Sequence, residues 1–394
     1  MAMETKYIVA NSGSASRKYA FYEGDHPLLF CHIEHENGGI IATCRVQKKE
    51  YVLPISDEDY ARSGRFFISL ALKEKLISEK NEISAVGFRV VAPGEYFLET
   101  KKIDSEYIQK LKDARENVPL HTSEIFFEIE EFSKLLSEAI YIGISDSAFH
   151  KNLPHLAKSY AISSDMNEAG IRRYGYHGIS LSYISEKMKD IFGSVPERVI
   201  VCHLGSGASV TALKNGKCFD TSMGFTPLEG LVMATRSGDI DAGAVIEIAK
   251  KKNISLEKVE EYLNTQSGLL GLSGFSSDVR ELLKKEAVGD TRAAFALEMF
   301  IYRVKKYIGA YSAILGGIDA IIFTAAIGER SPVMRERICN GLDYLGIILD
   351  EEKNKSVISK ESSIEGALSR VTVAVIPTDE TSEMANELRN FLKV

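Results

Sequence analysis

Two short turns, one near the start of each half of the chain, carry residue types that can bind phosphate groups. The first lies in YIVANSGSASRKYAFYEGD (residues 7–25) and the second in VCHLGSGASVTALKNGK (residues 201–217). Small residues in such turns let backbone N–H groups approach an anion closely, and hydroxyl groups can donate to its oxygens. The residues suited to this task are Asn11, Ser14, Ser16 and Lys18 in the first turn, and His203, Gly205, Ser206, Gly207 and Ser209 in the second.

Both turns also fit ordinary β-hairpins. Neither contains the GxxxxGK[ST] pattern of a P-loop, and Asn215-Gly216 is a strong two-residue hairpin signal. In each stretch a turn glycine, Gly13 or Gly205, lies eleven residues before a glycine that could close a hairpin. This weak repeat is expected if one strand-turn-strand unit opens two related domains, and two unrelated hairpins are the alternative.

Two arginines occupy positions where a charge needs an explanation. Residues 220–243 (DTSMGFTPLEGLVMATRSGDIDAG) are expected to form a long loop, which is usually functional, and this one carries Arg236. An arginine held there can clamp a carboxylate or a transferring phosphoryl group. Arg89 interrupts the apolar run 83–91, so it must be paired or must point into a polar site. An exposed arginine on an edge strand is the alternative for Arg89.

Histidines and carboxylates stand at the ends of several expected elements. His121 precedes a helix, and His177 lies between aromatic and glycine residues in RRYGYHGIS, although a lone histidine is usually structural. Asp146 follows the expected strand 139–145, where α/β proteins place functional carboxylates. Glu380 follows the expected strand 371–376 and could hold Mg²⁺ directly or through water.

A third glycine turn, residues 325–331 (AAIGERS), follows the apolar run 320–325. A strand, a small-residue turn and a helix can receive part of a nucleotide, and an ordinary strand-to-helix connection is the alternative. Further helices are expected at 123–140, 256–264 and 290–315. Strands alternating with helices predict an α/β protein with mixed sheets, and 394 residues favour two domains with a ligand cleft between them.

The composition argues against several classes of partner. The net charge is −7 without any dominant Lys/Arg block, which argues against nucleic acid and anionic membranes. The start MAMETKYIVANSG lacks a signal-peptide pattern, and no apolar run approaches the roughly 18 residues that cross a bilayer, so a cytoplasmic protein is expected. The five scattered cysteines are expected to be reduced thiols, because they form no CxxC motif.

The chain resembles the acetate kinase family of short-chain carboxylate kinases, in the sugar kinase, actin and Hsp70 superfamily. The long DTSMGFTPLEGLVMATRSGDID segment and RRYGYHGIS are its most specific motifs. The resemblance covers nearly the whole chain in order. The matching stretches are NSGSASRKY, VGFRVVAPGE, VPLHTSE, SDSAFHKNLP, RRYGYHGIS, HLGSGASV, DTSMGFTPLEGLVMATRSGDID, SGFSSDVREL, FTAAIGERS and VIPTDE.

The resemblance implies two duplicated actin-like (ribonuclease H-like) domains with mixed sheets and an active-site cleft between them. The first would comprise residues 1–149 with 379–394 returning to it, and the second residues 150–378. It implies a homodimer that binds acetate and ATP and catalyses ATP + acetate ⇌ ADP + acetyl phosphate by direct in-line transfer, with Mg²⁺ or Mn²⁺. A kinase of propionate or another short acid, or a non-catalytic nucleotide-binding relative, is the alternative.

The resemblance also implies roles for single residues. Arg89 and Arg236 would bind the carboxylate and steady the phosphoryl group, with His177 as a donor to that group. His121 would support it, and Asp146 would orient the substrate.

The remaining roles concern the metal, the acid and the nucleotide. Asn11 and Glu380 would form the magnesium site. The pocket for the methyl group would consist of Val91, Leu120, Tyr176 and Pro227. The nucleotide would contact the two phosphate turns and, around adenosine, Asp278, Val279, Arg280, Ala326, Ile327, Gly328, Glu329 and Arg330.

Several positions depart from the family pattern. The usual HRVVHGGE is FRVVAPGE here, and Ser206 replaces an asparagine in the second turn. The GIGEN turn has Ala326 and Arg330, and Tyr176 replaces a phenylalanine. These departures leave the preferred acid and phosphoryl donor open.

Overall fold

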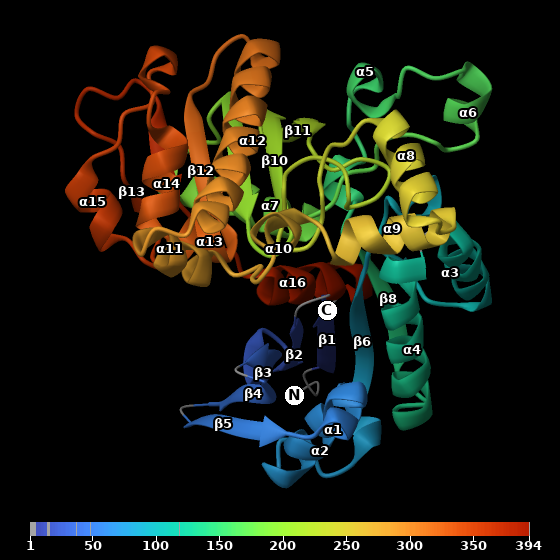
Figure 1. The fold of residues 1–394 in the computed structure, drawn as a ribbon. Coiled ribbons are helices and arrows are strands. Elements are labelled where there is room, and N and C mark those ends of the chain that lie inside the picture. The colour runs from blue at the N-terminus through green and yellow to red at the C-terminus, as the bar shows by residue number, and fades with distance from the viewer. Residues whose placement is uncertain (1–4, 14–15, 37, 48, 118, 394) are drawn as a thin grey trace. The chain divides into compact units, whose positions relative to one another are not determined.

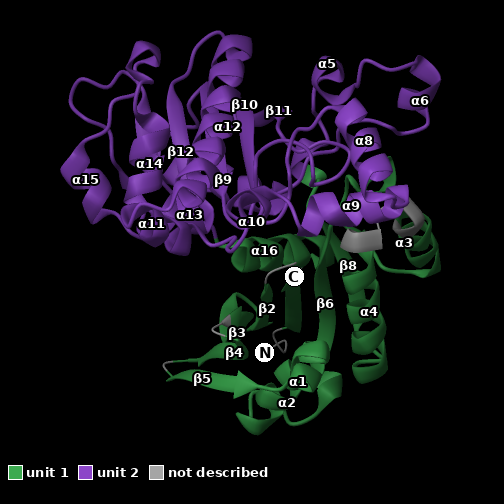
Figure 2. Ribbon diagram, viewed as in Figure 1, with its two compact units in different colours: residues 1–148, 379–394 green, residues 149–378 purple. Residues whose placement is uncertain are grey.

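The computed structural model describes residues 5–13, 16–36, 38–47, 49–117 and 119–393. The chain divides into two compact units, which are described separately below (Figure 2). Unit 1 comprises residues 1–148 and 379–394, so the C-terminal segment returns to it. Unit 2 comprises residues 149–378.

Unit 1 is built on a mixed sheet, which has eight strands in the described residues (Figure 1). The strand order is β5-β4-β3-β2-β1-β6-β8-β7. β1 pairs antiparallel with β2 and parallel with β6, and β6 pairs parallel with β8. The strands are β1 Lys6–Ser12, β2 Ser16–Glu23, β3 His26–Glu36, β4 Gly39–Val46, β5 Lys49–Ile55, β6 Ile83–Val90, β7 Lys101–Lys102 and β8 Ile140–Ser145.

Helices pack on both faces of this sheet. The α-helices are α1 Asp57–Ala61, α2 Ser63–Lys73, α3 Ser105–Asn117, α4 Pro119–Leu135 and α16 Glu380–Leu392. Consecutive side chains of β6 face the helices on opposite sides of the sheet, because successive side chains of a strand point to opposite faces. A Cβ on Gly87 would approach Leu388 of α16, whereas Phe88 packs edge-on against Phe132 of α4. The apolar core of unit 1 therefore lies between the sheet and these helices.

Unit 2 has its own mixed sheet, with six strands in the described part of the chain and the order β11-β10-β9-β12-β14-β13. The strands are β9 Arg198–Leu204, β10 Ala208–Lys214, β11 Lys217–Thr221, β12 Ala320–Thr324, β13 Ser362–Ser363 and β14 Thr372–Val375. The α-helices are α5 His155–Lys158, α6 Ser164–Glu168, α7 Gly178–Phe192, α8 Ala242–Lys252, α9 Leu256–Thr265, α10 Gly268–Ser273, α11 Val279–Ala287, α12 Thr291–Leu315, α13 Ala325–Arg330, α14 Pro332–Cys339 and α15 Glu351–Ser356. The 3₁₀ turns of the chain are Lys80–Glu82, Glu95–Phe97, Ala148–His150 and Asp343–Leu345.

The two sheets share one arrangement of strands. In unit 1 the order β3-β2-β1-β6-β8 joins an antiparallel meander to parallel strands, and β11-β10-β9-β12-β14 does the same in unit 2. The hairpins β1-β2 and β9-β10 correspond to the two turns of the sequence repeat. The predicted mixed α/β architecture with duplicated domains is confirmed.

Local signals account for both ends of the longest helix in the described residues. Helix α12 begins after Asp290, whose carboxylate accepts from the backbone N–H groups of Arg292 and Ala293. It ends at Gly316, which has a positive φ of 73° that glycine adopts readily. The prediction that His121 precedes its helix is wrong, because α4 already begins at Pro119. Proline suits the first helical position, since its missing N–H would have no partner there.

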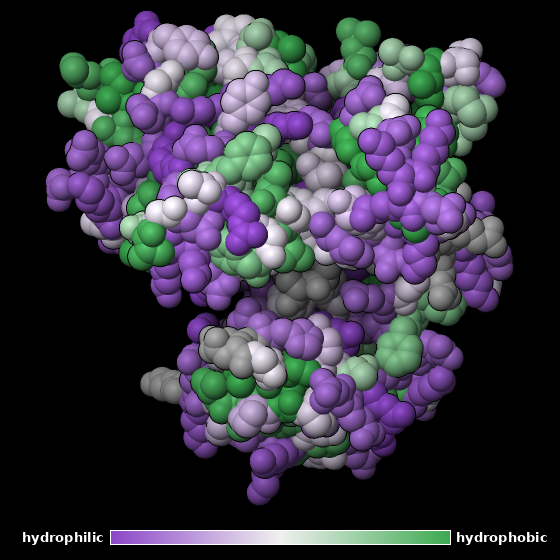
Figure 3. Space-filling view, in the orientation of Figure 1, coloured by the Kyte–Doolittle hydropathy of each residue, from purple (hydrophilic) through white to green (hydrophobic). Residues whose placement is uncertain are grey.

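The surface carries apolar residues singly. Leu156 and Leu368 are 93% and 83% exposed, and they belong to different segments. Figure 3 shows hydrophilic and hydrophobic residues interspersed over the visible face of each unit. No α-helix in the described ranges is long and apolar enough to span a bilayer.

One cysteine prediction is wrong. Cys31 of β3 lies opposite Cys44 of β4 in the antiparallel register, and the two form a buried disulfide. They are 13 residues apart without a CxxC spacing, so only the strand register brings them together. The other cysteines, Cys202, Cys218 and Cys339, are buried free thiols.

We predict that the disulfide is detectable and stabilising in the purified protein. Peptide mapping without reductant should recover Cys31 linked to Cys44, with the other cysteines alkylated only after unfolding. Reduction should destabilise unit 1 by about 3 kcal/mol, because a loop of this size gains chain entropy when unfolded. Thermal unfolding with and without reductant measures this, and a Cys31→Ala, Cys44→Ala double variant should not respond to reductant. An unlinked pair in air-oxidised protein would contradict the prediction.

Candidate functional site

A buried arginine–aspartate pair lies at one end of the unit 1 sheet. Arg89 belongs to β6, and Asp146 directly follows the neighbouring parallel strand β8. The backbone N–H of Asp146 donates to Val90 O at 3.0 Å, and Arg89 Nη2 lies 2.9 Å from Asp146 Oδ2. Asp146 is fully buried, and 14% of the Arg89 side chain is exposed. The parallel register therefore brings together two charges that are distant in sequence.

Asn11 and Glu380 complete this group in unit 1. Asn11 is the penultimate residue of β1, and its Nδ2 donates to Glu380 Oε2 at 2.7 Å while its Oδ1 accepts from Arg89 Nη1 at 3.3 Å. Glu380 is the first residue of α16, which Asp379 caps. Burial lowers the pKa of Arg89, but the carboxylates of Asp146 and Glu380 outweigh it and raise the pKa above its usual value. Arg89 therefore stays a cation.

The described residues of the first turn, for which the sequence predicts phosphate contacts, lie next to this group. Gly13 N donates to Ser16 O at 2.9 Å, and a Cβ on Gly13 would come within 3.9 Å of Arg89 Nη1. Lys18 of β2 pairs with Asn11 in the antiparallel register. Ser14 lies outside the described residues. Val91 directly follows β6, whereas Leu120 and His121 are in the first turn of α4 and their side chains are outside the described part.

A histidine pair marks the corresponding end of unit 2. His177 caps α7 with a φ of 60°, which is uncommon for a residue other than glycine. Its ring stacks on that of His203, at the end of β9, with centroids 4.0 Å apart. Nδ1 of His177 lies 3.0 Å from Ser209 Oγ, and Nδ1 of His203 lies 2.9 Å from Ser180 Oγ. Both rings are thus held in place by buried hydroxyl groups.

The second phosphate turn and Arg236 meet at these histidines. Gly205 N donates to Gly207 O at 3.0 Å, and Ala234 N, in the long loop, donates to Ser206 O at 3.1 Å. A Cβ on Gly207 would lie 3.1 Å from His177 Nε2 and 3.7 Å from Arg236 Nη1. Glycine at this position therefore lets the turn lie against both the imidazole and the guanidinium.

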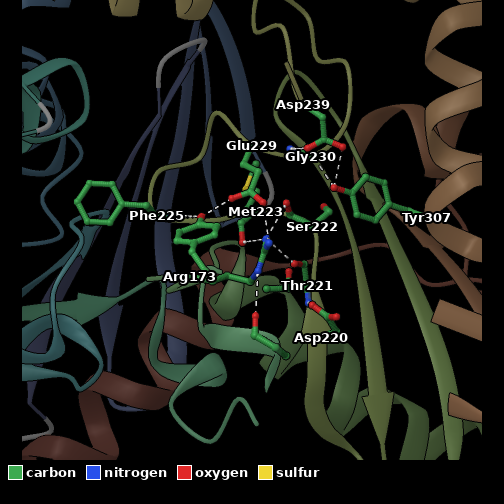
Figure 4. Close-up of polar contacts among 12 residues, drawn as sticks. Arg173, Asp220, Thr221, Ser222, Met223, Phe225, Glu229, Gly230, Asp239 and Tyr307 are labelled. Atoms are coloured by element: carbon green, nitrogen blue, oxygen red, sulfur yellow. Dashed lines mark hydrogen bonds and ion pairs between the residues drawn. The ribbon is translucent and has the colours of Figure 1, made fainter. Parts of the chain in front are cut away.

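The loop between β11 and α8 is long, as predicted, and a residue that the sequence analysis missed holds its start. Figure 4 shows the guanidinium of Arg173 among the loop's polar groups. Nη1 of Arg173 donates to the carbonyls of Thr221, Ser222 and Met223 at 3.0, 3.2 and 3.2 Å. Its Nη2 lies 2.6 Å from Glu229 Oε1. The only sequence signal was the paired arginines of RRYGYHG.

Further contacts hold the rest of the loop. Tyr160 donates to Glu229 and accepts from Phe225 N at 2.9 Å. Asp239 accepts from Gly230 N at 2.9 Å and from the Tyr307 hydroxyl (Figure 4). The loop is therefore anchored at both ends.

The middle of the loop carries Arg236 and one side of the expected acid pocket. Arg236 Nη1 donates to Pro227 O at 3.3 Å, and Arg236 O accepts from Met233 N. The Tyr176 hydroxyl donates to Phe225 O at 2.6 Å, and Tyr176 is 1% exposed. Tyr176 and Pro227 are thus linked through the same short stretch of loop.

The residues expected around adenosine lie on two helix starts of unit 2. Asp278 caps α11 by accepting from Arg280 N, and Val279 begins that helix. Ala326, Ile327, Gly328, Glu329 and Arg330 belong to α13, which follows β12. Arg330 Nε donates to Ser359 Oγ at 3.2 Å. The fully buried Arg335 donates to the carbonyls of Gly328 and Glu329, and burial lowers its pKa to about 10.

The structure thus gathers two groups of the predicted residues. Unit 1 brings together Asn11, Arg89, Asp146 and Glu380. Unit 2 brings together His177, His203, Gly207 and Arg236.

Comparison with known proteins identifies relatives along nearly the full chain. Residues 6–386 match the sequence model of the acetokinase family. Acetate kinases of Clostridium novyi and Thermotoga maritima are each 41% identical over 98% of this chain and over 98% and 99% of their own. The crystal structure of Porphyromonas gingivalis acetate kinase is similar with a TM-score of 0.84 and 36% identity, over 98% of this chain and 100% of that one. A propionate kinase from Francisella tularensis has a TM-score of 0.87 and 33% identity, over 97% and 98%.

We predict that Arg173→Lys destabilises unit 2 by about 1.5–3 kcal/mol. An ammonium group cannot reproduce the fork that contacts three carbonyls and a carboxylate, and hydrogen bonds of charged groups contribute about this much. Denaturant unfolding measures the change. Arg45→Lys, at an exposed ion pair with Glu50, is the matched control and should stay within about 0.5 kcal/mol of the parent. Equal stability of the two variants would contradict the anchoring role.

Proposed function

The chain belongs to the acetokinase family and is an ATP-dependent kinase that acts on a carboxylate, and we propose that it catalyses ATP + acetate ⇌ ADP + acetyl phosphate through the two groups described above. The observation that carries the assignment of residues is the Arg89 guanidinium, which Asp146 and Asn11 hold at a sheet end next to a phosphate-type turn.

The chemistry needs positive charge and alignment more than it needs a base. Acetate is already ionised at pH 7, so its oxygen can attack the γ-phosphorus while the bond to the bridging oxygen of ADP breaks. Arg89 and Arg236 are proposed to bind the carboxylate and the equatorial phosphoryl oxygens. Asp146 accepts from Nη2 of Arg89 and Asn11 accepts from Nη1, and together these contacts restrict the direction in which the guanidinium can donate.

His177 is the proposed donor to the transferring group. Its Nδ1 lies 3.0 Å from Ser209 Oγ, and this contact holds the imidazole ring. Nε2, the other ring nitrogen, is the atom that borders Gly207. The ring therefore presents Nε2 toward the second turn, which is the direction that the proposed donation requires.

Asn11 and Glu380 are proposed to contribute to a magnesium site. Their oxygens are the hard ligands that Mg²⁺ and Mn²⁺ prefer. No cluster of three or more His, Cys, Asp or Glu able to hold a metal occurs in the described residues. Water and phosphate oxygens would complete the coordination, as is common for Mg²⁺. The ion would neutralise charge on the phosphates.

The finer assignments follow the family resemblance. Ser14, Ser16, Lys18, His203 and Ser206 are proposed to contact phosphates, and His121 to support the transferring group. Asp278, Arg280 and residues 326–330 are proposed to contact adenosine. We also propose a cytoplasmic homodimer.

A propionate kinase is the second candidate. The Francisella tularensis structure is described as a propionate kinase and matches this fold along nearly the whole chain. Tyr176 and Pro227, together with Val91 and Leu120, are the residues proposed to set the length of the acid. Because the Tyr176 hydroxyl already donates to Phe225 O, we expect its ring to bound the pocket.

We predict that the protein forms an acyl phosphate that hydroxylamine traps. ATP with acetate should give the highest kcat/KM, propionate a lower value and butyrate less again, because each added methylene has to fit the site proposed for a methyl group. Chelation of divalent cations should abolish turnover, and Mg²⁺ or Mn²⁺ should restore it. A higher kcat/KM for propionate would favour the second candidate. No product with ATP and any of these acids would refute a carboxylate kinase.

We predict that Arg89→Ala and Arg236→Ala each reduce kcat by roughly 10³-fold or more, since an arginine at a phosphoryl-transfer transition state has about this effect. Circular dichroism should show that both variants remain folded. Arg45→Ala, at an exposed ion pair, should retain the parental kcat. A folded Arg236→Ala variant with near-parental kcat would show that the assigned role is wrong.

A further inference from the structure

Glu128 of α4 is a buried carboxylate outside the proposed site. It is 6% exposed, and its Oε1 accepts from Ser12 Oγ at 2.8 Å and from the Tyr19 hydroxyl at 2.5 Å. Its Oε2 is buried and has no hydrogen-bond partner within the described ranges. Burying a carboxylate is unfavourable unless it is well paired, so its presence in the core needs an explanation.

The groups around Glu128 compensate its charge only in part. Arg17 donates to Tyr60 O and to Ser63 Oγ at 2.6 and 2.8 Å, and Ser63 in turn contacts the Tyr19 hydroxyl. Burial raises the pKa of Glu128, whereas hydrogen bonds from Tyr19 and Ser12 and the charge of Arg17 lower it, and Glu131 raises it again. The net effect is a raised pKa.

Ser12, one of the two donors to Glu128, is the residue next to Asn11. Asn11 and Ser12 are consecutive in β1, so their side chains point to opposite faces of the sheet. On one face Asn11 contacts Arg89 and Glu380, and on the other Ser12 contacts Glu128. Ser12 also pairs with Arg17 in the register that closes the first turn. Glu128 thus holds β1 directly behind the proposed chemistry.

We infer that Glu128 is a positioning residue that fixes the end of β1 through Ser12 and thereby aligns Asn11 and the first phosphate turn. This inference rests on the proposed function, because it assigns a purpose to the placement of Asn11. Glu128 itself touches no reacting group. Tyr19 is the second donor that orients its carboxylate.

Comparing Glu128→Gln with Glu128→Leu separates this role from simple core packing. A carboxyl group whose folded pKa is raised contributes stability at low pH, which is lost as pH rises through the folded pKa. Glu128→Gln removes this titration but keeps an amide oxygen that can accept from Ser12 and Tyr19, so its stability should depend less on pH while β1 stays in place. Glu128→Leu removes the acceptor and should leave the end of β1 less ordered.

The decisive experiment measures stability, binding and turnover on the same variants. Glu128→Gln keeps an acceptor for Ser12 and should bind Mg·ADP like the parent. Glu128→Leu and Ser12→Ala each remove the hydrogen bond. Each should weaken Mg·ADP binding in calorimetry, and raise KM for ATP, roughly 10-fold, with a smaller change in KM for acetate. The double variant should be no worse than either single variant, because both remove one interaction. Glu131→Gln is the matched control, since Glu131 lies on the same helix and contacts Arg65 N. It should bind Mg·ADP like the parent.

The possible outcomes have distinct meanings. Parental Mg·ADP affinity in Glu128→Leu and Ser12→Ala, with a parent enzyme that makes acyl phosphate, would overturn the inference alone. A marked loss of stability in Glu128→Leu, with normal binding in Ser12→Ala, would also overturn it and would assign Glu128 to core packing. A parent that makes no acyl phosphate with any acid would instead refute the proposed function.

Discussion

The buried charge of Arg89 is the constraint on which the unit 1 site depends. A guanidinium placed inside a sheet must be neutralised, and Asp146 and Glu380 do this from β8 and α16. Their positions follow from the parallel register of β6 with β8 and from the return of the C-terminal helix to this unit. The requirement for neutrality therefore assembles residues from three distant parts of the chain around one cation.

In unit 2, Arg173 supplies hydrogen-bond donors to the backbone of a long loop. A loop of some twenty residues between β11 and α8 exposes many backbone carbonyls, which need donors if the loop is to be rigid. Arg173 supplies donors to the first two of these carbonyls, Ser222 and Met223, and to Thr221 at the end of β11, and Glu229 balances its charge. The loop can then hold Arg236 beside Gly207 and His177 without secondary structure of its own. Rigidity matters for the role proposed for Arg236, because a cation that moves stabilises a transition state less well.

Patterns within one element could be predicted from the sequence, but pairings between elements could not. Asp290 and Gly316 mark the ends of α12, and the arginine in an apolar strand marked Arg89 as a residue that needs a partner. The identity of that partner depends on strand register, as does the Cys31–Cys44 pair. Arg173 was missed because its partners are mainly backbone carbonyls, which leave no residue pattern. Glu128 was missed because EIFFEIEEF has several glutamates, and only the packing of α4 shows that this one is buried.

On one face of β1 lies Asn11, whose position matters for the proposed site. On the other face Ser12 contacts Glu128, a carboxylate whose burial is unfavourable. Asn11, which is proposed to serve the chemistry, and Ser12, which is proposed to anchor the strand, are adjacent because successive side chains of a strand point to opposite faces of the sheet. An apolar residue at position 12 would pack well but would not set the direction of the strand end, since apolar contacts are non-directional. A hydrogen bond to Glu128 specifies position, at some loss of stability. Where the position of a metal-binding oxygen matters, a directional hydrogen bond improves the site more than a more stable apolar core does.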